Sequence, residues 1–190
     1  MKKALLGALV LLLCACSLGM ANTPKEKTKE FLDKYKNQDQ EVLSDLDNIV
    51  SSEYSGDYAT RYKTLMTNQY KDLEYEIVDE IIEGDTATVV AKIKVYNYSS
   101  AINSANTYLS ENQNEFMLNA SDETTNDPNN TITNTIDNDK FLDYKFGLLE
   151  SISDKVTYTI DFSFRKENGK WIMESLNETD IEKIHGLYSE

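Results

Sequence analysis

The chain has 190 residues, a formal net charge of −14 and two cysteines, Cys14 and Cys16. An excess of acidic residues this large excludes nucleic acid as a partner, because nucleic-acid-binding surfaces are basic. The length is sufficient for the core of one folded domain, and that domain is expected to form no disulfide, because both cysteines lie close to the N-terminus.

The first segment has the layout of a secretory signal peptide, with two lysines before an apolar run that is too short to span a bilayer. The cut site resembles the bacterial lipobox, because Leu13 and Ala15 stand three positions and one position before Cys16. Cys14 fits less well, since Leu13 would then occupy the place of a small residue. The resemblance implies a signal peptide over residues 1–15 and lipidation of Cys16 by a diacylglycerol and a further acyl group.

The predicted location follows from this anchor. The protein is expected to be exported and held at the outer face of a bacterial membrane, either the cell membrane or the outer membrane of a two-membrane cell. Loss of the two lysines with the signal peptide lowers the charge to −16. Because anionic headgroups repel such a chain, contact with the membrane is predicted through the lipid anchor only, with residues 16–22 as the tether.

Helical patterns open the mature chain. Thr23 as N-cap, Pro24 at the first helical position and Glu26 as the partner in a capping box predict a helix start. Apolar residues at three- and four-residue steps continue this amphipathic helix to about residue 50, and the polar stretch 37–40 either bends it or divides it in two. A second helix is predicted after the break at residues 55–57.

The apolar period then changes to two, which predicts strands. Residues 73–82 and 86–98 form a hairpin around Glu83-Gly84-Asp85. The remaining predicted elements, in chain order, are a helix over 99–117, a polar loop over 119–139, a helix over 139–152, a hairpin of 155–166 with 171–176, and a helix over 179–187.

This order predicts an α+β fold: a curved, cone-like antiparallel sheet of about four strands, with helices packed on one face and a long N-terminal helix. One domain over residues 23–190, with a polar insert at 119–139, accommodates all of these elements. The insert is too polar to form part of the core.

Three segments carry a resemblance to the nuclear-transport-factor-2-like superfamily, and more narrowly to the exported lipoproteins of low-GC bacteria that contain such a domain. They are Phe31-Leu32-Asp33-Lys34-Tyr35, Gly84-Asp85-Thr86-Ala87-Thr88-Val89 and Gly169-Lys170-Trp171. The resemblance implies a cone that can hold a ligand, and it covers nearly all of the mature chain. Because the superfamily includes isomerases, dehydratases and peptide-binding modules, the fold leaves the function open.

Ionisable side chains on the inward face of a predicted strand are candidates for a functional site. The strands over 86–98 and 155–166 direct only apolar side chains inward, whereas strict alternation in the first strand places Asp79 beside Tyr75 and Ile77. A carboxylate among apolar side chains favours its neutral form and suits a general base or a ligand anchor. A bulge or a strand end that releases Asp79 to solvent is the alternative, and the apolar residues Val78 and Ile82 on the opposite phase favour it.

Other site candidates are few. Tyr75, Tyr158 and Trp171 are candidate pocket walls, although core packing explains most of the tyrosines more simply and Trp171 is expected to belong to the core first. His185, the only histidine, precedes Gly186 in the terminal helix and is predicted to be solvated. No second histidine or cysteine can join it in a metal site, so no catalytic residue, metal or cofactor is predicted.

Three functions remain compatible with these patterns. The leading one is a non-enzymatic binding domain whose cone takes a small apolar or peptide ligand. The second is an envelope lipoprotein that acts through contacts with another protein while its cone is packed solid. The third is an isomerase or dehydratase that uses Asp79. A filled cone with exposed apolar residues elsewhere favours the second function.

Overall fold

A capped helix opens the described part of the chain, which in this computed structural model comprises residues 23–118 and 136–189. The predicted signal peptide, Cys16, the tether and most of the polar insert lie outside these residues. Contacts divide the chain into two compact units. The first unit runs to Asn97 and resumes at Ser153, and the second is Tyr98–Ile152. This division is finer than the single domain predicted over residues 23–190.

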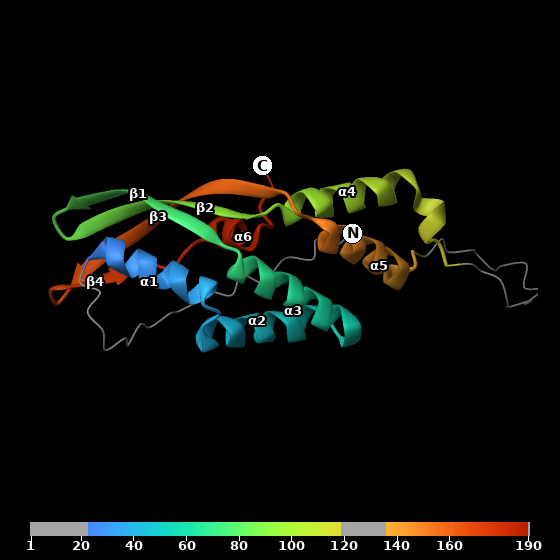
Figure 1. Ribbon diagram of the computed structural model, residues 1–190, viewed down its shortest axis with the longest axis horizontal. Helices are drawn as coiled ribbons and strands as arrows, with labels where there is room; N and C mark the ends of the chain where they lie inside the picture. Colours follow the sequence, from blue (N-terminus) through green and yellow to red (C-terminus); the bar gives the residue numbers. More distant parts are fainter. Residues whose placement is uncertain (1–22, 119–135, 190) are drawn as a thin grey trace, which may run out of the picture. The chain divides into compact units, whose positions relative to one another are not determined.

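The first unit contains the sheet and most of the helices (Figure 1). Its strands pair antiparallel in the order β1-β2-β3-β4, with the helices on one side. The predicted α+β class is therefore confirmed. The elements are α1 (Pro24–Lys36), α2 (Gln40–Glu53), α3 (Gly56–Lys71), β1 (Glu74–Glu83), β2 (Thr86–Tyr96), β3 (Lys155–Glu167), β4 (Lys170–Met173) and α6 (Glu178–His185).

The start of α1 follows the predicted capping chemistry. Thr23 Oγ1 accepts a hydrogen bond from the Glu26 amide, and the Glu26 carboxylate accepts one from the Thr23 amide, each at 3.1 Å. These bonds satisfy two donors that would otherwise have no partner within the helix. The helix ends at Lys36, and Gln38 adopts φ +54° before α2 begins. Of the two possibilities at residues 37–40, division into two helices is correct.

The face of the sheet toward α1 and α6 is the apolar one. Ala87, Val89, Ala91, Ile93 and Val95 of β2 stand opposite Phe164, Phe162, Ile160, Tyr158 and Val156 of β3. Nearly all of these side chains are buried, as the alternation of the two strands predicts. Phe31 of α1 packs edge-on against Phe162 with 5.8 Å between ring centroids. Side chains of the protein itself therefore occupy this face.

Both predicted hairpin turns form. Gly84 has φ +62° between β1 and β2, and Asn168 and Gly169 have φ +50° and +78° between β3 and β4. Two successive positive φ angles are typical of a type I′ turn, whose twist matches that of the strands. β4 ends at Met173, earlier than the predicted residue 176.

The second unit is a helical hairpin. α4 (Tyr98–Glu111) continues through the short 3₁₀ helix η1 (Gln113–Phe116), and α5 (Asn138–Ser151) returns. Phe116 is buried among rings from both helices, with Tyr108 at 6.1 Å and Phe141 at 5.7 Å between centroids. A bridge between Met117 and Ile136 closes the ends of the hairpin. The predicted helix over 99–117 is therefore an α-helix and a shorter 3₁₀ turn.

Gly147 in α5 offers a stabilising substitution. It is exposed, and a Cβ built there meets no heavy atom within 4 Å. Because alanine loses less backbone freedom in a helix, we expect Gly147→Ala to stabilise the hairpin by about 1 kcal/mol. Hydrogen exchange of α5 peptides measures the effect, and unchanged or faster exchange in the variant would contradict it.

Candidate functional site

The first strand departs from strict alternation at the predicted anchor. Ile77 pairs with Ala91 and Asp79 pairs with Val90, so Val78 is an additional residue that forms a β-bulge. Tyr75 and Ile77 face α1, but beyond the bulge the faces are exchanged. Asp79 is exposed on the opposite side of the sheet, and its carboxylate accepts a hydrogen bond from the Glu80 amide at 2.8 Å.

The predicted inward position of Asp79 is therefore wrong, and the alternative, a bulge that releases it to solvent, is correct. A period-two reading assumes that every residue pairs, whereas one additional residue moves all later side chains to the other face. Glu80 takes the inward position instead. Its carboxylate accepts a hydrogen bond from the Lys25 amide at 2.9 Å, at the positive end of the α1 dipole.

The three predicted wall residues lie in two places. Tyr75 and Tyr158 both pair with Ile93, so they occupy one row across the inner face. Trp171 pairs with Lys166, eight residues further along β3 than Tyr158, which is about 26 Å at the rise of a β-strand. The three residues therefore do not line one pocket.

Each of these aromatic side chains already has a partner within the protein. The Tyr75 hydroxyl donates to Asp33 at 2.5 Å, and burial together with this carboxylate raises the pKa of the phenol. The Tyr158 hydroxyl donates to the carbonyl of Tyr188 at 2.9 Å. Lys166 Nζ lies 5.2 Å from the centre of the Trp171 ring. All three predicted wall residues therefore already contact other residues of the protein.

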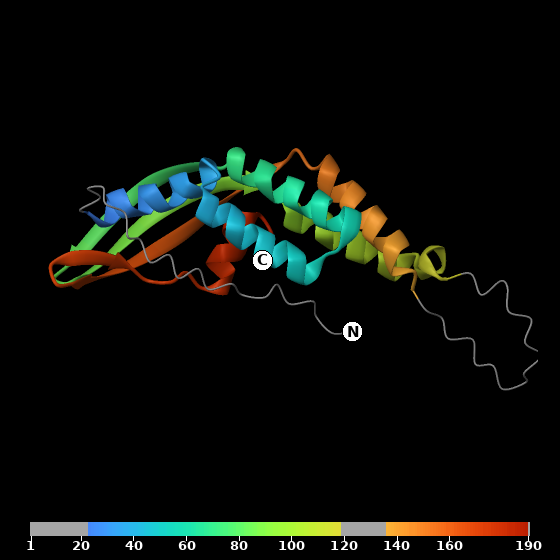
Figure 2. The ribbon, with the colours of Figure 1, turned by 90° about the horizontal axis from the view of Figure 1, so that it is seen from below.

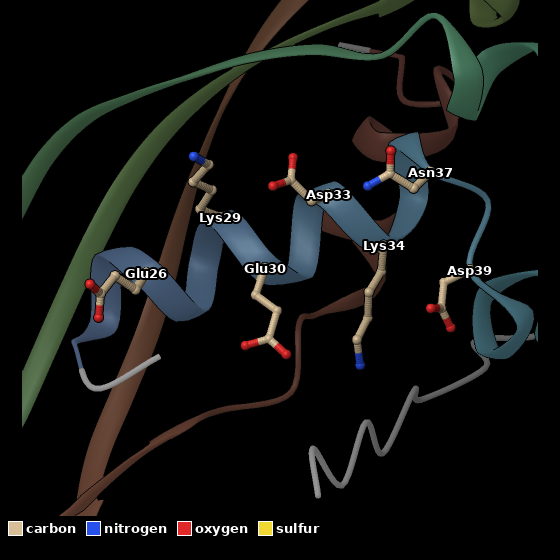
Figure 3. A pocket seen from close by; sticks show the side chains of 7 residues that line it. All are labelled: Glu26, Lys29, Glu30, Asp33, Lys34, Asn37 and Asp39. Carbon is tan, nitrogen blue, oxygen red and sulfur yellow. The ribbon is translucent and has the colours of Figure 1, made fainter. Parts of the chain in front are cut away.

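One open groove runs along the exposed side of α1, with a volume of about 420 Å³ (Figure 3). The residues that line it are all polar or charged, and they carry both charge signs: Glu26, Lys29, Glu30, Asp33, Lys34, Asn37 and Asp39. Figure 3 shows Glu30 and Lys34 on one side of the helix axis and Lys29 and Asp33 on the other. Such a groove does not suit the small apolar ligand that the sequence predicts.

The first unit contains a buried histidine, His185, at the end of α6. His185 is only 4% exposed, and its Nε2 lies 3.1 Å from the Tyr70 hydroxyl. Its Nδ1 is buried and has no hydrogen-bond partner among the described residues. Burial lowers the pKa of this imidazole from 6.5 to about 4, because the charged form loses its hydration. The prediction of a solvated His185 is therefore wrong.

A second buried polar group joins α6 to the rest of the unit. The Gln69 side chain accepts a hydrogen bond from the Tyr96 amide at 2.8 Å and donates to the Ile184 carbonyl at 3.3 Å. Gln69 links α3, β2 and α6 in this way. Its helical spacing from Met66 and Tyr70 was the signal that could have identified it, since all three share the buried face of α3.

We compared the chain with known proteins. No known protein family matches the chain, and no curated protein does. Among solved structures, YcdA, a candidate lipoprotein from Bacillus subtilis, is similar with a TM-score of 0.36 and 15% sequence identity. The match covers 87% of this chain and 47% of that chain, so the protein spans about half the length of this neighbour.

The class defined by the fold is an α+β protein with an open, four-stranded antiparallel sheet. The likeness to the Bacillus protein is too remote to define a shared family, so the resemblance to the nuclear-transport-factor-2-like superfamily stays a prediction. Across residues 23–118 and 136–189, no helix has both the length and the apolar character that crossing a bilayer requires.

Proposed function

We propose that the protein is an exported lipoprotein, anchored through Cys16, that acts by binding another protein of the bacterial envelope and not by catalysis. The observation that carries this proposal is the packed inner face of the sheet. Ile160, Phe162 and Phe164 are at most 2% exposed beneath the helices. Because side chains of the protein itself fill this face, recognition is left to the outside of the unit.

The free edge of β1 is the surface best suited to a partner. No described strand pairs with its outer side, so the edge offers backbone donors and acceptors to an added strand. The bulge leaves Val78 about half exposed. Residues 74–83 contain five carboxylates and no basic residue, which disfavours pairing with a second copy and favours a basic, extended segment of another protein.

A small ligand is the second candidate, because Tyr75 and Tyr158 share one row of the inner face. Their hydroxyls already have partners within the protein, which weakens this candidate. An isomerase or dehydratase that uses Asp79 loses its main support, since that carboxylate is exposed.

Photo-crosslinking in cells tests the proposed partner surface. A crosslinking residue at Val78 of the full lipoprotein is expected to yield one defined protein adduct. Reversal of two charges on the edge, Glu76→Lys with Asp79→Lys, is expected to lower the yield about tenfold. The matched control, Glu53→Lys with Asp57→Lys, makes the same charge change on exposed helical positions and should leave the yield unchanged.

Equal yields from both double variants would contradict the proposal, as would the absence of an adduct. Native mass spectrometry tests the second candidate on the same material. A small-molecule adduct that Tyr158→Ala removes would favour the ligand and overturn binding of a protein as the function.

A further inference from the structure

One end of the sheet in the first unit combines features found nowhere else among the described residues. We call it the sheet tip: residues 80–88 and 163–173, which contain both hairpin turns, and the first turns of α1, residues 23–29. The Lys166 amide donates to the Asp85 carbonyl at 2.7 Å, which holds the two turns together. The bond from the Lys25 amide to Glu80 adds α1. Figures 1 and 2 show these segments at the same end of the sheet.

Large apolar side chains of the sheet tip are exposed on both faces. Ile81 pairs with Thr88 on the open face and is 47% exposed, whereas Ile82 pairs with the buried Ala87 on the helix face and is 52% exposed. Ile172, 38% exposed, belongs to β4 at the other edge of the sheet. A single flat partner could not cover both faces and both edges, but a medium that surrounds the tip could.

The sheet tip also differs from the rest of the protein in charge. It contains six basic residues, Lys25, Lys27, Lys29, Arg165, Lys166 and Lys170, against five acidic ones, Glu26, Glu80, Glu83, Asp85 and Glu167. The mature chain as a whole carries −16. Acidity therefore repels anionic headgroups from the remainder of the chain but not from this end.

The position of the tether selects this end as well. Only six residues separate Cys16 from Thr23, the N-cap of α1. Fully extended, this segment reaches at most about 25 Å. α1 begins at the sheet tip. A lipid at Cys16 would therefore keep the tip within about 25 Å of the bilayer, whereas the opposite end of the sheet could lie farther away.

We propose that the sheet tip docks on the bilayer that holds the lipid anchor, with Ile81, Ile82 and Ile172 in the headgroup region. This inference rests on the lipid anchor of the proposed function. Within the tip, Lys166 lies over Trp171 and Arg165 pairs with Glu167. The exposed side chains of Lys25, Lys29 and Lys170 are the ones expected to reach phosphates while their stems cover apolar surface. Docking at this end leaves the part of the β1 edge before residue 80, including Val78, outside the docked tip and accessible to a partner.

Trp171, the only tryptophan of the chain, lies in the sheet tip and reports on docking. The experiment uses the lipidated full protein in vesicles of phosphatidylethanolamine and phosphatidylglycerol, with or without brominated acyl chains. Bromine quenches only indoles close to the bilayer, so we expect quenching of roughly twofold for a tip in the headgroup region. The triple variant Ile81→Ser, Ile82→Ser, Ile172→Ser should lose most of it.

Leu118→Ser is the matched control, because Leu118 is 54% exposed but belongs to the second unit. It should leave quenching unchanged, and circular dichroism should show all variants folded. Protein that floats with vesicles but shows no quenching would overturn docking and leave the anchor intact. Protein that does not float, or a Cys16→Ser variant that floats equally well, would overturn the anchor itself. Emission that changes with protein density but not with bromination would assign the tip to a second copy.

Discussion

Gly186→Ala is expected to destabilise the protein by about 3 kcal/mol. The added methyl group has no space, and the backbone has a positive φ angle that alanine disfavours. Gly186 ends α6 with φ +70°. A Cβ built there lies 2.0 Å from the Tyr96 carbonyl oxygen and 2.9 Å from Gln69 Nε2. The nearest atom belongs to Tyr96, the last residue of β2, which pairs with Lys155 and whose amide donates to Gln69. A shift of this carbonyl would therefore disturb the contacts that join β2, β3 and α3.

Gly84→Ala provides the matched control for this effect. Gly84 has φ +62° in the first hairpin turn, but a Cβ there meets no heavy atom within 4 Å. It should therefore cost only about 1 kcal/mol, the penalty of a positive φ alone. Urea unfolding followed by Trp171 fluorescence measures both variants in the first unit. Similar losses would mean that α6 can move away from the sheet at little cost.

Acid is expected to destabilise the first unit through His185. The imidazole binds a proton near pH 6.5 in the unfolded chain and only near pH 4 in the fold. The unfolded state therefore holds more protons between these values, so stability rises with pH across this window. The contribution is complete above pH 6.5 and is lost as the pH falls to about 4. A shift of this size corresponds to about 3 kcal/mol.

The comparison of wild type with His185→Gln isolates this contribution from the titration of carboxylates. Unfolding at pH 7.0 and pH 4.5 should show a larger loss for wild type, by about 2 to 3 kcal/mol. Tyr70→Phe serves as the control, because it removes the hydrogen bond to Nε2 and keeps the titrating ring. If wild type and His185→Gln lose stability equally, the histidine is not buried in its neutral form.

These predictions concern one structural arrangement, the attachment of α6 to α3 and β2. His185, Gly186 and Gln69 all contribute to it, and burial raises the pKa of the neighbouring Tyr70 hydroxyl as well. A neutral histidine and un-ionised phenols are compatible with this buried site at neutral pH.

The strands of the sheet differ in how well a local sequence pattern predicts which side chains are buried. Alternation in β2 and β3 predicted the buried set correctly, because both strands pair on two sides and a slip in register would expose the core. β1 pairs on one side only, which permits the bulge at Val78 and sends Asp79 to solvent. The apolar residues Val78 and Ile82 on the opposite phase were the local sign of this irregularity, but they could not show whether it was a bulge or a strand end.

The sequence by itself determined the elements whose causes are local. Some features depend on interactions over only a few residues, so they could be predicted in chain order. They are the capping box at Thr23, the turns at Gly84 and Gly169, and the apolar periods of the helices and central strands. The tertiary structure alone decided the burial of His185, the position of Trp171 and the presence of both hairpin turns beside the start of α1. These depend on contacts between residues far apart in the chain, whose free energy arises only when the sheet and its helices pack together.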